Sequence, residues 1–218
     1  MNWLVMQLAD SSFPAGGFAH SAGIEAASQL GELPEGGVEA FVRDAMWQVG
    51  YGSLPIVGDT HREPAKIARV EAFCDAYLTG AVANRASRTQ GRALASACAR
   101  SFDDDRLARL YDDVRERRLL GHQAPLFGAV AAALGVARTD AQALWVHVAL
   151  RGVLSAAVRL GLTGAHESQS MQRAMAPLLE QVLVECGEIG CEGVAQTAPR
   201  QEIVASQHDH LYSRLFQS

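Results

Sequence analysis

Short clusters of glycine and proline divide this 218-residue sequence into stretches that favour helix, and this pattern constrains the fold more than any other feature. Between the clusters the chain is rich in Ala, Leu, Arg, Glu and Gln, and no segment alternates apolar and polar residues as a half-buried strand does. The breaks predict about nine or ten helices joined by short loops. They lie at residues 11–17, 31–37, 50–55, 58–64 and 187–199. We therefore expect an all-α fold in which helices pack on helices.

Chain length and composition favour a single domain with a full hydrophobic core. Hydrophobic residues make up 49% of the chain and charged residues 20%, which excludes disorder as a global description. We assign residues 1–206 to one helical domain and residues 207–218 to a C-terminal tail. The formal net charge of −5 argues against sequence-independent binding of nucleic acid, which requires clustered Lys and Arg.

The sequence does not predict export or insertion into a membrane. Residues 1–9 are apolar but short, and they lack both a basic region and a cleavage site, so we do not expect a signal peptide. The most apolar stretch, residues 143–162, carries Arg151 and Arg159, and arginines within a span are costly in lipid. The four cysteines form no C-x-x-C pair and are interpreted as reduced thiols. We expect a cytoplasmic protein.

The segment from about residue 140 to 162 is the predicted central helix, because most of its circumference is apolar. Its polar exceptions, His147, Arg151, Ser155 and Arg159, follow one another at i+4 spacing and form one slowly drifting stripe. The stripe is either a solvent-facing edge or a buried polar network that lines a water-filled passage. In the second case Arg151 needs a carboxylate or carbonyl partner.

No combination of residues predicts catalysis. Residues 10–12 supply Asp and two Ser, and residues 20–21 supply His and Ser, but no strand is predicted that can carry a nucleophile elbow. Gly16 and Gly17 precede a predicted helix but lack a phosphate-binding fingerprint, so we interpret them as part of a turn. We predict no catalytic residue and a protein that is not an enzyme.

The tail contains the best candidates for metal ligands. His208 and His210 are two residues apart, so on a helix they diverge by about 200° and can chelate one ion only from an extended backbone. Cys191 is the nearest candidate for a third ligand. Zinc-finger and H-E-x-x-H spacings are both absent from the sequence. We expect no resident metal and no other cofactor.

Two segments concentrate polar, aromatic and glycine residues without forming a catalytic pattern, and we call them the dense segments. The first covers residues 7–25 and reads QLADSSFPAGGFAHSAGIE, and the second is the tail, QHDHLYSRLFQS. Within the tail, Tyr212, Leu215 and Phe216 surround Arg214, a composition typical of interaction hot spots. The tail is therefore expected to dock either on a partner or, as a final helical turn, on its own domain.

These two segments resemble the terminal signatures of the urease accessory protein F family. The N-terminal resemblance covers residues 4–21 and 23–25, and the C-terminal one covers residues 212–218. Three internal motifs also match in order and spacing, namely NRASRTQGRAL at 84–94, HQAPLFG at 122–128 and RGVLSAAVRLGLTG at 151–164. The five ordered motifs span essentially the whole chain and are far more specific together than any one alone.

The resemblance implies an all-helical homodimer that takes part in urease maturation. Members of the family bind a second accessory protein, of the D or H type, and a nickel-carrying GTPase of the G type. The assembly docks on apo-urease and helps to insert nickel. Members are not regarded as enzymes, and nickel passes through the complex rather than serving as a cofactor. The alternative is a nickel-binding carrier that uses His208 and His210.

The family pattern also assigns roles by position. The terminal signature is assigned to contact with the D/H-type partner, on which the tail becomes ordered, through Tyr212, Arg214, Leu215 and Phe216. The N-terminal signature is assigned to contact with a partner or within the dimer, through Gly16, Gly17, Phe18 and His20. A polar passage or a surface facing the GTPase is assigned to Arg151, Ser155 and Arg159. Residues 205–210 depart from the family's usual run, which weakens the case for nickel ligands there.

Overall fold

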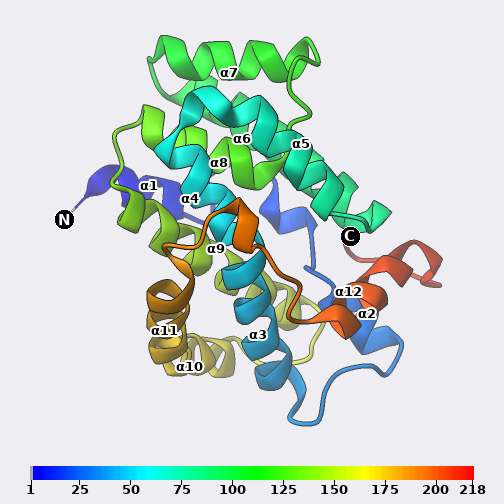
Figure 1. The fold of residues 1–218 in the computed structure, drawn as a ribbon. Coiled ribbons are helices and arrows are strands. Elements are labelled where there is room, and N and C mark those ends of the chain that lie inside the picture. The colour runs from blue at the N-terminus through cyan, green and yellow to red at the C-terminus, as the bar shows by residue number, and fades with distance from the viewer. Residues whose placement is uncertain (1) are drawn as a thin grey trace.

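A computed structural model describes residues 2–218, and over that range the chain forms helices and connecting segments without a β-strand (Figure 1). The prediction of an all-α fold is confirmed. Twelve α-helical segments are present, and α3 and α4 join through a π-helical turn, so that the described chain contains 11 separate helices. This is slightly more than the nine or ten predicted.

The α-helices are α1 Trp3–Ala9, α2 Ile24–Gln29, α3 Gly37–Gln48, α4 Leu54–Arg62, α5 Ile67–Tyr77, α6 Ala81–Ser101, α7 Asp105–Arg115, α8 Gln123–Ala133, α9 Arg138–Arg159, α10 Ala165–Ala174, α11 Ala176–Cys186 and α12 Pro199–Ser206. The π-helical turn is η2 Val49–Ser53. The 3-10 segments are η1 Gly17–Ala19, η3 Pro64–Lys66, η4 Cys191–Gly193 and η5 Gln207–His210.

The predicted interruption at residues 50–58 is wrong, because the glycines there lie inside continuous helix. Their role is close packing. A Cβ atom added at Gly50 would lie 2.6 Å from a methyl carbon of Val182 on α11. On the facing helix α8, a Cβ added at Gly128 would lie 2.5 Å from the carbonyl oxygen of Val57. The absence of side chains at these glycines therefore lets α4 approach α8 and lets η2 approach α11. The predicted break near residue 63 is present, because α4 ends at Arg62.

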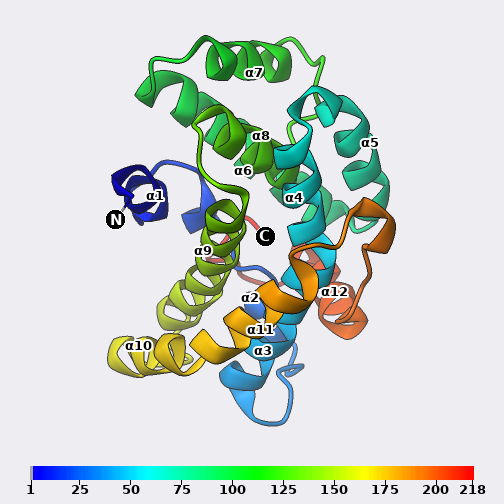
Figure 2. The same ribbon diagram turned by 60° about the vertical axis from the view of Figure 1, so that its left-hand side comes forward.

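The predicted central helix is confirmed as α9, which runs through the middle of the molecule (Figure 2). It packs against the N-terminal helices α1 to α4 and against α8, α10 and α11, which lie closer to it in sequence. By length and hydropathy α9 could cross a membrane, but 56% of its most apolar window is buried inside the domain. That burial is the environment of a core helix.

The C-terminal tail continues from α12 without a linker. Helix α12 packs against α2 and α6, and η5 follows it directly and also contacts α2. Residues 211–218 then fold back toward the segment between η1 and α2. In the described chain the tail therefore lies on its own domain, next to the first dense segment.

Candidate partner-binding site

A buried carboxylate on α2, Glu25, holds the tail on the domain. Its side chain belongs to a residue that is only 1% exposed. Its Oε1 accepts the backbone N–H of Leu215 at 2.6 Å, and its Oε2 accepts that of Phe216 at 3.2 Å. The ring of the fully buried His208 places Nε2 2.9 Å from Oε2. One carboxylate thus connects three residues of the tail, His208, Leu215 and Phe216. Hydrogen bonds to a carboxylate are stronger than those between neutral groups.

The last two residues of the tail run beside residues 19–21. The backbone N–H and the hydroxyl of Ser21 both donate to the carbonyl oxygen of Ser218, at 2.6 and 2.9 Å. The N–H of Gln217 donates to Ala19 at 2.8 Å, and His20 Nδ1 lies 2.5 Å from Ser218 Oγ. Burial lowers the pKa of His20, and the neighbouring His208 and Arg85 lower it further, which favours the neutral form of this ring.

Arg159 on α9 links both segments through its guanidinium group. The guanidinium carbon lies 3.8 Å from the ring centre of Phe18 and 4.2 Å from that of Phe216. One guanidinium nitrogen also donates to the carbonyl oxygen of Phe18. Two cation–π contacts and a hydrogen bond therefore join α9, η1 and the tail. We call this arrangement the terminal junction, defined by residues 18–25, Arg159, His208 and residues 213–218.

The polar stripe of α9 is covered in part by the N-terminal segment. Arg151 donates to the carbonyl oxygen of Ala9 at the C-terminus of α1, where the helix dipole favours a cation. His147 is half-buried, and burial followed by the charge of Arg151 lowers its pKa. Ser155 is exposed. The stripe thus combines an exposed position with arginines that bind backbone carbonyls, and its role as a passage or a GTPase-facing surface stays a prediction.

A second polar network joins two internal motifs. The buried Glu71 on α5 accepts the backbone N–H groups of residues 120–122 at 2.6 to 2.8 Å. His122, which is fully buried, lies 3.1 Å from the hydroxyl of Ser87 and 3.0 Å from a carboxylate oxygen of Asp75. The Ser87 hydroxyl also accepts the first N–H of α8 at 3.2 Å. This Ser–His–Asp group connects α5 and α6 to the start of α8, and its histidine is buried.

Comparison with known proteins decides the family. The profile of the family described as UreF matches residues 34–176, which is more than half of the chain. The chain belongs to the UreF family. The resemblance detected in the sequence motifs is therefore confirmed, and UreF membership indicates a role in urease maturation.

Full-length relatives extend the match to the terminal junction. The "Urease accessory protein F" of Arabidopsis thaliana is 34% identical over 222 residues, covering 99% of this chain and 92% of the relative. The protein of the same name from Oryza sativa subsp. indica is 32% identical, with 98% and 84% covered. The "Urease accessory protein UreF" of Kocuria rhizophila is 30% identical, with 98% and 95% covered. Both dense segments of this UreF chain thus lie within regions shared with its relatives.

The predicted partner-binding residues of this UreF chain divide into two groups. Phe216 and His20 are buried in the terminal junction. Gly16 has a left-handed backbone conformation with φ of 79°, which is consistent with its predicted place in a turn. The exposed group consists of Phe18 at 71% exposure, Tyr212 at 104%, Leu215 at 54%, and Arg214 and Gly17 beside them. Arg214 lies 3.4 Å from Asp209, which also pairs with Arg85. The first group supports the backbone of the surface that the second group presents.

The candidate metal ligands of this UreF chain are not brought together. His208 faces Glu25, whereas His210 is exposed at the end of η5. Cys191 lies on η4, where its backbone N–H donates to Asp59, and burial raises the pKa of its thiol to about 12. Among residues 2–218, no three His, Cys, Asp or Glu side chains gather in a way that could hold a metal ion. The use of His208 and His210 by a nickel carrier stays a prediction without support from their placement.

Sequence reasoning missed the two buried carboxylates, Glu25 and Glu71. Each binds backbone N–H groups that lie far away in the sequence, 190 residues in the case of Leu215. The signal for Glu25 was its place in the Gly-Ile-Glu end of the N-terminal motif, where no cationic residue stands nearby. Glu71 lies outside all five motifs and carried no comparable signal.

Proposed function

We propose that this chain is an adaptor that links a D/H-type urease accessory protein to a nickel-carrying G-type GTPase on apo-urease. It acts as a cytoplasmic homodimer, contributes binding surfaces to the assembly and catalyses no reaction itself. Nickel passes through the complex and is not held as a resident cofactor of this chain. Membership of the UreF family supports the setting of this proposal, namely urease maturation.

The observation that carries the proposal is the exposure of large side chains on and directly beside the hydrogen-bonded backbone of the terminal junction. Phe18, Tyr212 and Leu215 are all more than half exposed. The backbone N–H of Leu215 donates to Glu25 and the carbonyl oxygen of Phe18 accepts from Arg159, while Tyr212 directly precedes the terminal junction. A preorganised surface loses less conformational entropy on binding than a free tail does. We infer that the D/H-type partner meets a formed backbone, so that the ordering on binding is confined to these side chains.

A binding measurement with purified proteins tests the proposal. The Tyr212→Ala/Leu215→Ala double variant should bind the D/H-type protein at least about tenfold more weakly, because truncating a hot-spot side chain costs about 2 kcal/mol. The matched control is Val184→Ala, which removes an exposed apolar side chain on α11. Circular dichroism should show an unchanged helical fold in all three proteins.

The outcomes separate two claims. If the wild-type chain binds neither the D/H-type protein nor the G-type GTPase, the adaptor function is wrong. If the wild type binds and the double variant binds equally well, the adaptor function stands, but the assignment of the tail surface to the D/H-type partner is wrong.

A further inference from the structure

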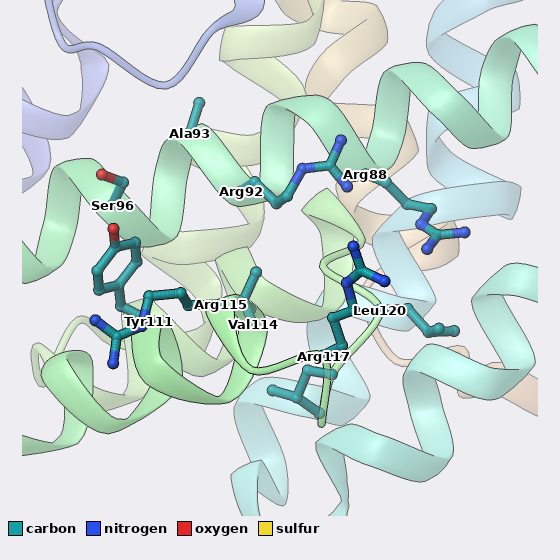
Figure 3. Close-up of a pocket in the computed structure, with 10 residues that line it drawn as sticks. Arg88, Arg92, Ala93, Ser96, Tyr111, Val114, Arg115, Arg117 and Leu120 are labelled. Carbon is teal, nitrogen blue, oxygen red and sulfur yellow. The ribbon is translucent and has the colours of Figure 1, made fainter.

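A pocket of about 770 Å³ lies between α6 and the end of α7, away from the terminal junction (Figure 3). Arg88 and Arg92 reach it from α6, while Arg115 and Arg117 reach it from the end of α7 and the turn that follows. Figure 3 shows Arg88, Arg92 and Arg117 gathered at one end of this pocket. We call it the arginine pocket. Its charge is opposite in sign to the formal net charge of the chain, which is −5.

The three gathered arginines form no ion pair within the described chain, although the charge of Arg88 acts on the nearby carboxylates of Glu71 and Asp75. Arg115 pairs with Asp112 at 3.0 Å, but Arg88, Arg92 and Arg117 form no ion pair with any residue in the range 2–218. Arg92 donates to the hydroxyl of Thr89 at 3.3 Å. Arg88 and Arg92 are four residues apart on one helix face, where like charges repel each other. A bound anion would convert this repulsion into attraction.

The backbone at Arg117 adds an independent observation. Arg117 follows α7 in the left-handed conformation, with φ of 61°, at the helix-ending position that glycine usually occupies. A left-handed conformation costs a residue with a Cβ atom about 1–2 kcal/mol relative to glycine. The arginine thus replaces the residue that this turn favours, and its side chain points into the pocket rather than toward a local partner.

The shape and lining of the site favour a protein segment over a small anion. Apolar and aromatic side chains, including Tyr111, Val114 and Leu119, form part of the wall. A neighbouring hollow of about 510 Å³ shares Arg88 and Arg92 with the arginine pocket, so the two form a track along α6, and its lining adds Arg85 and one carboxylate, Asp75. A free phosphate would use neither the apolar wall nor the length of this track, whereas a peptide would use both.

We propose that the arginine pocket binds an acidic segment of a protein partner. Carboxylates of the segment pair with Arg88, Arg92 and Arg117, whose planar guanidinium groups match a carboxylate in two-pronged geometry. An adjacent apolar side chain of the segment packs against Tyr111 and Leu119. The inference rests on the proposed function, because the partner is one of the proteins that the adaptor links.

The test compares two full-length double variants with the same change in net charge. Arg88→Glu/Arg92→Glu reverses the charge inside the pocket. Arg69→Glu/Arg173→Glu is the control, since both arginines are exposed, lie outside the pocket and form no ion pair within the described residues. Affinity is measured for the purified D/H-type protein, the G-type GTPase and apo-urease, at low and at physiological salt. Thermal unfolding verifies that both variants are folded.

The pocket variant should bind one of the three proteins at least about tenfold more weakly than wild type, while the control retains its affinity. The difference should shrink as salt is raised, because salt screens charges at an exposed surface. Equal affinities for wild type and both variants would overturn the inference while leaving the adaptor function intact. Equal losses in both variants would also overturn it, as an effect of overall charge.

Inorganic phosphate is the second probe. Saturable binding of phosphate tighter than about 1 mM, lost in the pocket variant, would identify a site for a small anion and overturn the assignment to a protein segment. If the wild-type chain binds none of the three proteins, the proposed function fails, and this inference fails with it.

Discussion

At the scale of single residues, two buried carboxylates of this UreF chain bind backbone N–H groups that are remote in sequence. Glu25 and Glu71 each accept several backbone hydrogen bonds, and each also stands close to a buried histidine. Burial raises the pKa of Glu71, while the backbone N–H groups of residues 120–122 oppose this effect. Such groups are costly unless their partners are all present, so their replacement should have large effects.

Replacing Glu25 by Gln tests this at the terminal junction. The amide keeps the shape of the side chain but turns one acceptor into a donor that faces N–H groups. We expect the free energy of unfolding to fall by about 2 kcal/mol, as for other unsatisfied buried groups. Limited proteolysis should then cut residues 207–218 faster. Glu39→Gln, at an exposed position on α3, is the control in the same urea titration and should leave both quantities unchanged.

The buried histidines predict a dependence of stability on pH. Burial lowers the pKa of His122 below its ordinary value of 6.5, and the hydrogen bond with Asp75 opposes this only in part. The unfolded chain therefore takes up a proton at a higher pH than the folded chain. Stability should fall as pH drops through 6.5, and this decline should cease below the pKa of the folded state.

The measurement is the free energy of unfolding between about pH 7.5 and 5.5. His122→Gln should reduce the dependence on pH, whatever its effect on absolute stability, whereas replacing the exposed His166 by Gln should not. An unchanged slope in the His122 variant would show that this residue does not contribute to the pH dependence.

At the scale of elements, glycines set how closely the helices approach. The sequence pattern predicted breaks at the glycines of residues 50–58, where the structure has continuous helix and close packing. A glycine has the same appearance in a sequence whether it ends a helix or lets a neighbour come near. Only the neighbouring helix distinguishes the two, and that neighbour is remote in sequence.

Two glycine substitutions are expected to change the stability of the fold in opposite directions. A Cβ atom at Gly91 on α6 would lie 2.1 Å from the carbonyl oxygen of Gly121, so Gly91→Ala should destabilise the fold by about 3 kcal/mol or more. Gly152 lies within α9 with no atom within 4 Å of an added Cβ, so Gly152→Ala should stabilise it by about 0.5–1 kcal/mol. Chemical denaturation of the two variants side by side checks both, and equal effects would contradict the packing argument.

At the scale of the whole molecule, the fold class and the central helix were predictable, whereas the assembled site was not. Helix-favouring composition and the apolar circumference of residues 140–162 are local properties, so they can be read without tertiary information. The partners of the polar stripe are not local, because Arg151 and Arg159 bind carbonyl oxygens of Ala9 and Phe18, 142 and 141 residues away. The two terminal motifs lie at opposite ends of the sequence, and only folding brings them together.

Nickel binding is the prediction that belongs to this scale. Because the structure separates His208 from His210 and Cys191, the isolated chain should bind nickel no more tightly than about 1 µM in equilibrium dialysis. His210→Ala removes an exposed ring without touching Glu25, so it serves as a variant that leaves the fold intact. Sub-micromolar binding that this variant or His208→Ala removes would support the alternative function of a nickel carrier.

The hydrogen bonds of Glu25 span 183 to 191 residues of sequence, which has a kinetic consequence. Contacts so distant form only after the intervening helices have gathered, because closing a long loop is entropically unfavourable until other contacts shorten it. Until then the carboxylate remains hydrated and α2 has an open flank. Seating of residues 208–216 should be a late event in folding, and their release should be an early event in unfolding.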